Sequence, residues 1–475
     1  MGCGNEYNSW HRGGLLGPNG REVFGAIATA GEYLMSRTPS ELLEQVGTTV
    51  EAVPAVAHLD KNVIQASYGG RRESVPNDTL SGRGLFFITE QRKLMLDCTA
   101  GHYQMTWGYR HPVLDAAVRE ALDAGIVPDD HSNIPGAPVK RLAYKLAELC
   151  NPGDVGLPQC DDSGVRDDDA ALNTVLLGIV TGSIACSTAL KIMLARHREQ
   201  KGTRPAMVTL EGNYHGTDMF AQRMRHMWEG YFSDFDFVNV EPNDLAALED
   251  VFLGIGERVM GVMLEPVMMN REAILIEPDF AQRVRELCDG VDALMAVDEI
   301  QTGFWCPEVF HYKRWGVVPD FVICGKGMSA GVHPLSAVVF RRPLDILAQY
   351  DSISTNGGAP LAAHAALHSI ALIEAEAERI GRVAEGFEAM MRGLVAQFPD
   401  VLRSYQGDGF LSGLKFHRVE HALEFHRRCV ERGLWVRVHA YHEGHSTILT
   451  KFALLLDEPV IEFVRQAFAE LLREL

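Results

Sequence analysis

Residues 293–303 read ALMAVDEIQTG, and residues 321–327 read FVICGKG. Each segment begins with a short apolar run, residues 293–297 in the first and 321–324 in the second, and a charged side chain follows soon after. Apolar runs of roughly four to eight residues are typical of strands buried on both faces of a parallel sheet. Ligands of such sheets bind at the carboxyl ends of the strands, where Asp298 and Lys326 stand.

The same pattern extends on both sides of these segments. From about residue 113 to residue 345, short apolar runs alternate with segments of helical periodicity. This alternation predicts an α/β fold in which a large, mostly parallel central sheet is covered by helices. The expected strands are 174–180, 206–210, 259–264, 293–297 and 321–324, and the expected helices are 185–198, 245–253 and 279–288.

A chain of 475 residues is long enough for two or three domains. We expect an N-terminal segment at 1–112, a large domain at 113–345 and a smaller α+β domain at 346–475. The stretches 1–20 and 159–169 are expected to be irregular, with a boundary near 68–84. The elements expected outside the large domain are helices at 23–45, 360–375, 378–397 and 459–472, a hairpin at 85–96 and a strand pair near 410–416.

Charge and composition exclude several classes of protein. Lys and Arg number 44 against 63 Asp and Glu, so the net charge is −19, which repels nucleic acid and anionic lipid. No apolar run is long enough to cross a bilayer, and the N-terminus lacks a secretory pattern. The nine cysteines form no CxxC pair, which fits reduced thiols. We therefore expect a cytoplasmic protein without nucleic-acid or membrane partners.

Asp298 and Lys326 have complementary chemistry. A buried carboxylate needs a cation or hydrogen-bond donors, so Asp298 could pair with the protonated nitrogen of a heterocycle and make the ring an electron sink. The alternative is an Asp that caps a turn. Lys326 lies between Gly325 and Gly327, which leaves its amine room to form an imine. The alternative is a solvated loop lysine.

Two further loops follow predicted strands. Thr181, Gly182 and Ser183 stand between a strand and a helix, where main-chain N–H groups can hold a phosphate, although a plain helix cap would use the same residues. Tyr214 follows the strand 206–210 and could stack on a heteroaromatic ring, although it could equally be a half-buried turn residue. The order of phosphate loop, aromatic residue, acid and lysine, each at a strand end, favours one shared site.

Over roughly residues 80–465 the chain resembles the class III aminotransferases, which are fold-type I enzymes that use pyridoxal 5′-phosphate (PLP). The resemblance rests on several short motifs spread over most of the chain. The matching segments are Thr181-Gly182-Ser183, Tyr214-His215-Gly216, Glu265-Pro266-Val267, Asp298-Glu299-Ile300-Gln301-Thr302-Gly303, Gly325-Lys326-Gly327 and the loop Thr355-Asn356-Gly357-Gly358.

The resemblance implies roles for these residues. Lys326 forms the Schiff base (internal aldimine) and shuttles protons, Asp298 pairs with the ring nitrogen, and Tyr214 stacks on the ring. Thr355 reaches the phosphate of a neighbouring subunit, so a homodimer with shared active sites is expected, its large domain binding PLP and its N-terminal segment contributing to the small domain and to dimer contacts. The residues implied to bind the cofactor are Thr181, Gly182, Ser183, Tyr214, His215, Glu265, Asp298, Gln301, Lys326 and Thr355.

The resemblance also implies the reaction, in which an amino group moves between an amino donor and a keto or aldehyde metabolite. The same apparatus supports aminomutase, racemase or decarboxylase chemistry, which are the alternative predictions. No metal site is expected, because His439, His442 and His445 lack a zinc-type spacing. Trp107, Trp305 and His102 are candidates for the lining of the substrate pocket; core packing is the alternative for the tryptophans.

The chain departs from the family pattern at the substrate-binding positions. Lys451 stands where many members have an arginine that grips the substrate carboxylate, and lysine has no bidentate fork. Arg437, a little upstream, is the other candidate for this role. Asn270 and Gln406 replace a Glu and an Arg. We therefore expect an amine that needs no arginine clamp, or a non-standard keto metabolite, as the substrate.

Overall fold

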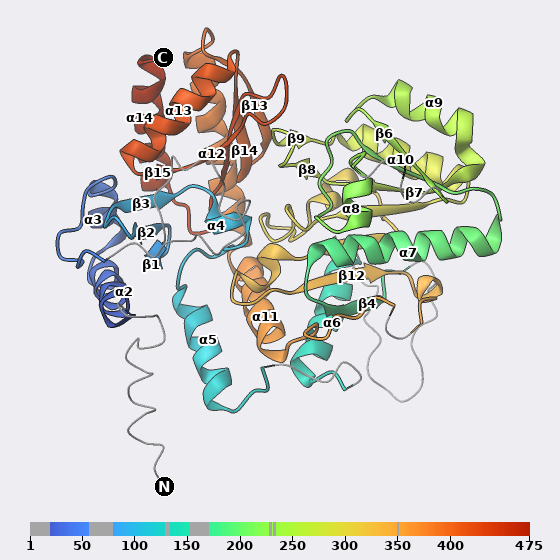
Figure 1. Ribbon diagram of the computed structural model, residues 1–475, viewed down its shortest axis with the longest axis horizontal. Coiled ribbons are helices and arrows are strands. Elements are labelled where there is room, and N and C mark those ends of the chain that lie inside the picture. The colour runs from blue at the N-terminus through green and yellow to red at the C-terminus, as the bar shows by residue number, and fades with distance from the viewer. Residues whose placement is uncertain are drawn as a thin grey trace.

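A computed structural model describes residues 20–56, 79–128, 134–151, 171–227, 230, 234–348 and 351–475. The acidic stretch 159–169, residues 1–19 and most of the expected boundary at 68–84 lie outside the described residues. The chain forms a large α/β lobe and a smaller lobe beside it, which contains both the first helices and the C-terminal helices (Figure 1).

The large lobe is built on a seven-stranded sheet with the order β4-β12-β11-β10-β7-β5-β6. Strand β10 runs parallel to β7 and β11, and β5 runs parallel to β6 and β7, whereas β12 is antiparallel to both β11 and β4. The expected mostly parallel sheet is therefore confirmed. The strands are β4 (Thr174–Ile179), β5 (Ala206–Leu210), β6 (Asp236–Val240), β7 (Val259–Leu264), β10 (Leu294–Asp298), β11 (Phe321–Cys324) and β12 (Ser336–Phe340).

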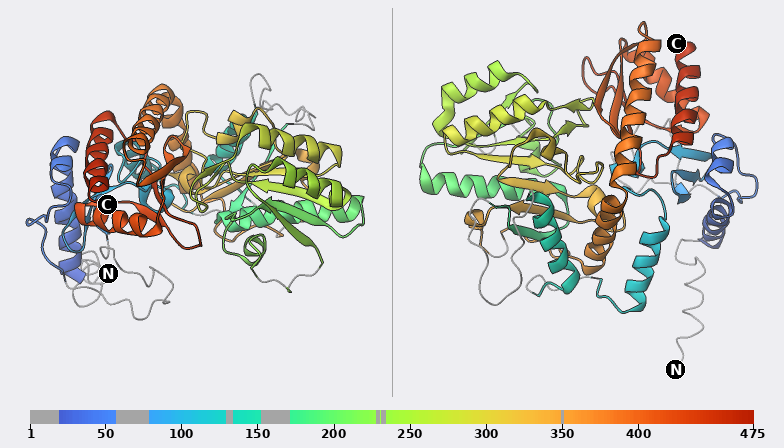
Figure 2. Two further views of the ribbon diagram at one scale, coloured as in Figure 1. Left: turned by 90° about the horizontal axis from the view of Figure 1, so that it is seen from above. Right: turned by 180° about the vertical axis from the view of Figure 1, so that it is seen from behind.

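Helices cover both faces of this sheet, as Figure 2 shows from above. Alternate strand residues face opposite sides: Leu294 and Ala296 pack with α7 (Gly182–Gln200), whereas Met295 and Val297 pack in the core that includes α10 (Pro278–Gly290). The expected strands and helices agree with the observed ones within a few residues. Strands β6 and β12 are absent from the expected set, and β6 is a half-buried edge strand with a polar Asp and Asn in it.

The N-terminal segment supplies a small sheet that the C-terminal part completes. Strands β1 (Thr79–Arg83), β2 (Phe86–Thr89) and β3 (Leu94–Asp97) are antiparallel neighbours, and β15 (Leu434–Trp435) pairs in parallel with β3. The expected hairpin at 85–96 is confirmed.

The single helix expected at 23–45 is wrong. Two helices, α2 (Gly20–Met35) and α3 (Pro39–Glu44), occupy this stretch. The chain breaks between them because Thr38 and Glu41 form a capping box and Pro39 starts α3.

The C-terminal part carries a four-stranded sheet with the order β13-β14-β17-β16. The strand pair expected near 410–416 is a longer hairpin that begins at Leu402. The elements are α11 (Pro360–Ala375), α12 (Ala377–Gln397), β13 (Leu402–Asp408), β14 (Leu411–Phe416), α13 (Val419–Arg432), β16 (Arg437–His439), β17 (Thr447–Lys451) and α14 (Glu458–Arg473). Helix α11 packs on α5 (Pro112–Asp123) and α6 (Ala137–Cys150) of the large lobe.

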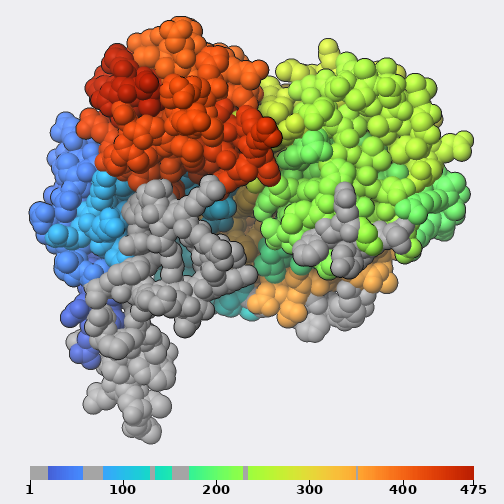
Figure 3. All heavy atoms as spheres, turned by 45° about the horizontal axis from the view of Figure 1, so that its top comes forward, coloured from blue at the N-terminus to red at the C-terminus, as the bar shows by residue number. Residues whose placement is uncertain are grey.

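Several short elements complete the fold. Strands β8 (Val267–Met268) and β9 (Ile274–Leu275) form a hairpin, and the remaining pieces are α4 (Ala100–Tyr103), α8 (Met219–Arg223), α9 (Leu245–Ile255), η2 (Gly256–Arg258), η3 (His311–Trp315), η4 (Lys326–Ser329) and η5 (Arg342–Leu344). Figure 3 shows the residues after about 400 as one lobe beside the lobe of the central sheet. The domain division at residues 112 and 345 stays a prediction.

Two further properties bear on the class of protein. Among the described helices, none combines the length and the apolar character that crossing a bilayer requires. The seven cysteines within the described ranges are all buried and free, while Cys3 and Cys160 lie outside those ranges.

Candidate active site

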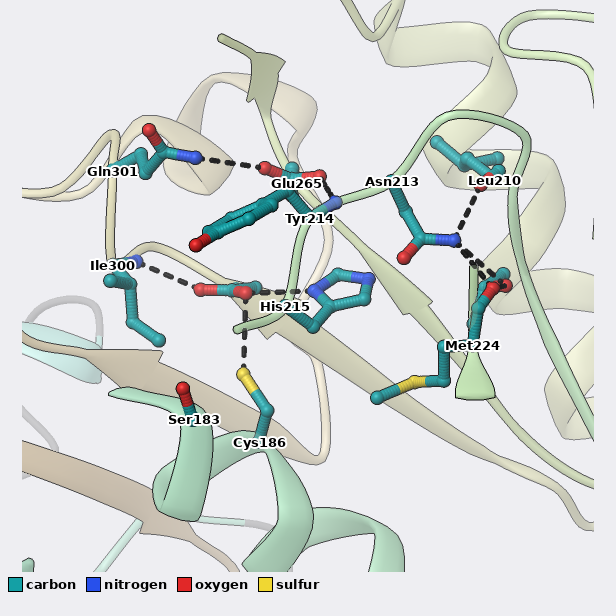
Figure 4. Close-up of polar contacts among 12 residues, drawn as sticks. Ser183, Cys186, Leu210, Asn213, Tyr214, His215, Met224, Glu265, Ile300 and Gln301 are labelled. Atoms are coloured by element: carbon teal, nitrogen blue, oxygen red, sulfur yellow. Dashed lines mark hydrogen bonds and ion pairs between the residues drawn. The ribbon is translucent and has the colours of Figure 1, made fainter. Parts of the chain in front are cut away.

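A cavity of about 280 Å³ lies at the carboxyl ends of the central strands. Seven of the predicted site residues line it: Thr181, Gly182, Ser183, Tyr214, His215, Gln301 and Lys326. Asp298 and Glu265 are buried and hydrogen-bond to the lining segment 214–215. Thr355 is exposed and does not line the cavity. The structure therefore brings together nine of the ten predicted residues. Figure 4 labels five of them, Ser183, Tyr214, His215, Glu265 and Gln301.

Lys326 begins η4, three residues beyond Ile323, and Ile323 pairs in register with Asp298 on the adjacent strand. Its φ of 40° lies in the left-handed region, so the main chain turns sharply here. A Cβ atom on Gly327 would lie 2.1 Å from Cζ3 of Trp305, and one on Gly325 would lie 2.7 Å from Oγ of Ser336. Both neighbours of Lys326 must therefore be glycine for Trp305 and Ser336 to pack.

The environment of Lys326 favours a reactive amine. Burial lowers the pKa of Lys326 to about 8; the charges of Asp298 and Glu265 oppose this shift, and that of Arg437 adds to it. The Nζ atom lies 6.0 Å from the centroid of the Tyr214 ring. A lysine with this pKa is partly uncharged near neutral pH, which is what a nucleophilic or proton-accepting amine requires.

Asp298 ends β10 and receives three hydrogen bonds. The main-chain N–H of Ile300 donates to Oδ1 at 3.0 Å, while Nδ1 of His215 and Sγ of Cys186 contact Oδ2 at 2.8 Å and 3.3 Å. Figure 4 shows His215 and Cys186 approaching from different sides. Burial tends to lower the pKa of His215, but the hydrogen bond and charge of Asp298 raise it overall. These donors fix the orientation of the carboxylate and occupy three of its acceptor directions.

Cys186, His215 and Asp298 are close enough to bind a metal, because their ligand atoms all lie within 4.8 Å of one another. Burial and the charge of Asp298 raise the pKa of the Cys186 thiol well above its usual value. Cys186 is therefore a hydrogen-bond donor and not a thiolate ligand. Within the described ranges this is the one group with such spacing, so His439, His442 and His445 do not form one.

The loop 181–183 leads into the N-terminus of α7, where main-chain N–H groups have no partner within the helix. The Thr181 side chain makes no capping hydrogen bond, and Oγ of Ser183 accepts one from the N–H of Thr217 at 3.0 Å. A Cβ atom on Gly216, whose φ is 123°, would lie 2.2 Å from Oγ of Ser183. The loop is held tightly against residues 216–217 and offers an anion the positive end of a long helix.

Glu265 and Gln301 support the wall that carries Tyr214. The main-chain N–H of Tyr214 donates to Oε1 of Glu265 at 2.8 Å, and Nε2 of Gln301 donates to Oδ1 of Asn270 at 3.1 Å. Burial raises the pKa of Glu265 to about 7. Asn270 lies in the turn of the β8–β9 hairpin, so this hairpin reaches the edge of the site.

Several site residues were not among those predicted from the sequence. Cys186 follows Ser183 by about one helical turn, so helical periodicity could have indicated it. Ser329 and Ser336 line the cavity from the segment that follows Lys326, whereas nothing in the sequence pointed to Gln104. Trp107 and Trp305, which were candidates for the substrate pocket, are core residues with 0% and 1% exposure.

A second polar cluster, formed by Arg437 and His102, lies close enough to Lys326 for their charges to interact. Arg437 approaches Nε2 of His102 at 3.4 Å, and its guanidinium lies 5.1 Å from the centroid of the Tyr103 ring. Burial, together with the charges of Arg437, Lys326 and Lys451, lowers the pKa of His102 to about 4, so this histidine is neutral. Within the described residues, no carboxylate forms an ion pair with Arg437.

Comparison with known proteins points to one family. The model of the family "Aminotransferase class-III" matches residues 70–449. An uncharacterised aminotransferase of Archaeoglobus fulgidus is 28% identical over 81% of this chain and 85% of its own length. An acetylornithine aminotransferase of Gloeobacter violaceus is 27% identical over 74% of this chain and 83% of its own length. A Toxoplasma gondii ornithine aminotransferase with PLP at its active site has the same fold, with a TM-score of 0.71 and 20% identity over 85% of this chain and 92% of that one.

Proposed function

The chain belongs to the class-III aminotransferase family, and we propose that its PLP-dependent transamination takes place in the cavity between Lys326 and Asp298. One observation carries the proposal: a half-buried lysine with a lowered pKa and a buried, donor-bound carboxylate stand at the tips of adjacent parallel strands. Such a pair suits a flat heterocycle that forms an imine with the lysine at one end and has a protonated ring nitrogen for the carboxylate at the other.

The residues of the cavity fit PLP. Asp298 keeps room for a further partner after its three donors, because a carboxylate has about four lone-pair directions. The N-terminus of α7 and Ser183 supply donors for the phosphate, and Gly182 must lack a Cβ atom because one would lie 2.5 Å from Ile300. Tyr214 supplies the aromatic face. These residues, with Thr181, His215, Glu265 and Gln301, would hold the coenzyme.

PLP, when bound, withdraws electrons from the carbon that carries the donor's amino group. The Lys326 amine would take the proton from that carbon, hold it as an ammonium group and release it again during the exchange; a pKa of about 8 suits both directions. His215 and Cys186 hold the Asp298 carboxylate in a fixed orientation. The lining residues hold the substrate beside the Lys326 amine and exclude water from it.

For the substrate pair we propose an amino donor and a keto or aldehyde acceptor. Any anionic group on the substrate would bind at Arg437, because this arginine is close enough to lower the pKa of Lys326 and forms no ion pair within the described residues. His102 beside it is neutral near pH 7, so its protonation does not alter how strongly Arg437 attracts an anionic group in that pH range. An amine without a carboxylate would leave Arg437 solvated.

We further propose a cytoplasmic homodimer with shared active sites. Thr355 is exposed in the turn before α11, and the N–H of Ser354 donates to the carbonyl of Gly178 at 2.7 Å, which fixes this turn to the end of β4. This arrangement leaves Thr355 free to reach a second copy of the chain. The buried free cysteines and the net charge of −19 support a reducing, aqueous compartment.

The test is a screen of amine donors and keto acceptors on the PLP-loaded enzyme, read by the absorbance of the coenzyme. A transaminase loses the original absorbance with donor alone and regains it with a keto acid. Lys326→Ala is the blank: we expect it to bind PLP non-covalently and to turn over nothing. Turnover by Lys326→Ala, or conversion of a single substrate without any second one, would refute the proposal.

A further inference from the structure

Lys451 is the last residue of β17, and its side chain is entirely buried. Its Nζ atom donates to the carbonyl of Gln301 at 2.6 Å and to that of Tyr103 at 3.1 Å. The same atom lies 3.4 Å from the centroid of the Trp305 ring. Two N–H groups are thus used by main-chain carbonyls and the third side faces an aromatic ring, so nothing remains to bind a ligand.

The three groups that Lys451 contacts belong to segments that build the active site. Gln301 lines the cavity and follows Asp298 closely in the chain. Tyr103 has a φ of 62° in the turn that presents Gln104 to the cavity. Trp305 packs so closely on Gly327, next to Lys326, that no Cβ atom fits there. One side chain from the C-terminal sheet therefore connects two loops around the cavity, that of Tyr103 and the one that carries both Gln301 and Trp305.

The cluster leaves no space for a substrate group beside Lys451. Trp305 is 1% exposed, and its Nε1 atom donates to the carbonyl of Phe452 at 2.9 Å. Burial and the nearby charge of Lys326 lower the pKa of Lys451 well below its usual value. A carboxylate could reach this amine only by displacing the indole ring or the two carbonyls.

We infer that Lys451 is a positioning residue: it fixes the loops of Tyr103, Gln301 and Trp305 around Lys326 and does not bind the substrate. This assignment agrees with the expectation that Lys451, which stands where many family members have a carboxylate-binding arginine, does not take over that role. It rests on the proposed function for the location of the reaction, and it predicts that discrimination between carboxylate-bearing and carboxylate-free amines does not depend on Lys451.

The kinetic test uses Lys451→Met in the PLP-loaded enzyme, with two matched pairs of amines: alanine with ethylamine, and 4-aminobutyrate with butylamine. Single-turnover rates are followed through the coenzyme absorbance. For each pair we expect the limiting rate to fall by a similar factor for both members, about 10- to 100-fold, because loosened loops misplace the reacting groups. The amine concentration for half-maximal rate should change little. A loss confined to the carboxylate-bearing amines would overturn the inference.

Lys451→Arg separates the two roles further. A guanidinium group does not fit in the closed space beside Trp305, so a positioning role predicts a loss as large as that of Lys451→Met. A substrate-binding role predicts retained or improved rates with alanine and 4-aminobutyrate, because arginine binds a carboxylate in a bidentate manner. If Lys451→Met does not fold, Trp305→Phe replaces it in the test, with the same unselective loss expected.

Hydrogen exchange provides a readout that needs no turnover. In Lys451→Met, main-chain amides at 99–106 and 299–306 should exchange faster than in the unmodified enzyme. Unchanged exchange in both segments would overturn the inference. If no amine alters the coenzyme absorbance of the unmodified enzyme while these segments still exchange faster in the variant, the proposed function fails and the contact role of Lys451 stands.

The chain offers a matched control in Lys93. Its Nζ atom also donates to two main-chain carbonyls, those of Val430 and Glu431, at 3.1 Å and 2.6 Å. Lys93 belongs to the turn before β3 and does not line the cavity. We expect Lys93→Met to leave the single-turnover rates with all four amines within about 2-fold of the unmodified enzyme, because a contact far from the cavity has little influence on the reacting groups.

Discussion

Asp298 ends β10 and Lys451 ends β17, and both ionisable side chains are buried near the same cavity. Three donors converge on the Asp298 carboxylate, which still has capacity for a cation. The Lys451 amine is surrounded by two main-chain carbonyls and an aromatic ring, so it has no hydrogen-bonding position left for a ligand. A buried charge with an unused bonding direction can bind a ligand, whereas a saturated one stabilises the chain around it.

The largest expected effect is that of Asp298→Asn, which removes the negative charge but keeps the shape. We expect kcat to fall by about 10³-fold, since a charge aimed at the reacting system is lost. The matched control is Asp320→Asn, because Asp320 is also buried, precedes β11 at the other end of the sheet and pairs with Arg285. Steady-state kinetics measures both; a loss of under about 10-fold in Asp298→Asn would remove the distinction between the two buried charges.

Glu272 is a third buried charge and resembles Lys451 in being saturated. It accepts hydrogen bonds from Lys415 Nζ at 2.6 Å, Thr447 Oγ1 at 2.7 Å and the N–H of Ser446 at 2.8 Å, and so connects the β8–β9 hairpin to the C-terminal sheet. Lys415→Met leaves the carboxylate buried without its cation and should lower the free energy of unfolding by about 3 kcal/mol. Urea unfolding measures this, and an unchanged value would show that the pair is not a stabilising contact.

The same pair has a defined pH dependence. Burial raises the pKa of Glu272, but the contacts with Lys415, Thr447 and Ser446 outweigh burial and hold the pKa below 4.5. A carboxylate with a lowered folded-state pKa contributes stability above its unfolded-state pKa and loses it as pH falls through the folded value. The difference in unfolding free energy between the unmodified enzyme and Glu272→Gln should therefore have its largest value at pH 7 and decrease below about pH 4.5.

A smaller effect is expected from Cys186→Val, which removes one of the three donors to Asp298. A hydrogen bond to a charged group contributes about 1.5 kcal/mol, so kcat should fall by roughly 10-fold. Cys186→Ser keeps a donor and should retain most of the activity. Equal losses in the two variants would indicate that packing, and not the hydrogen bond to Oδ2, is the contribution of Cys186.

The smallest expected effect concerns the pH at which Lys326 becomes reactive. The pKa of Lys326 is lowered to about 8 mainly by burial, and the positive charge of Arg437 contributes to the lowering. Arg437→Met should therefore raise the pKa of Lys326. The rate of PLP addition to the cofactor-free protein, measured against pH, should show its midpoint at higher pH in the variant. A midpoint that does not move would place Arg437 too far from Lys326 to act on it.

Much of the fold follows from local sequence signals. The strands at 206–210, 259–264 and 321–324 have the same limits in the structure as in the prediction, because short apolar runs bounded by polar residues are typical of buried strands. Edge strand β6 carries a weaker apolar signal. The break between α2 and α3 was readable from Thr38, Pro39 and Glu41, but the helical periodicity on both sides conceals it.

The sequence by itself determined the central sheet and which side chains stand at its strand tips, since both depend on patterns a few residues long. Only the tertiary structure decided which buried charges are saturated. Lys451 meets Tyr103 and Gln301, and Glu272 meets Lys415 and Thr447, across large separations in the chain. Whether a buried ionisable group can still bind a ligand depends on how many of its hydrogen-bonding positions are already occupied. Those partners come together only when distant segments of the chain are packed.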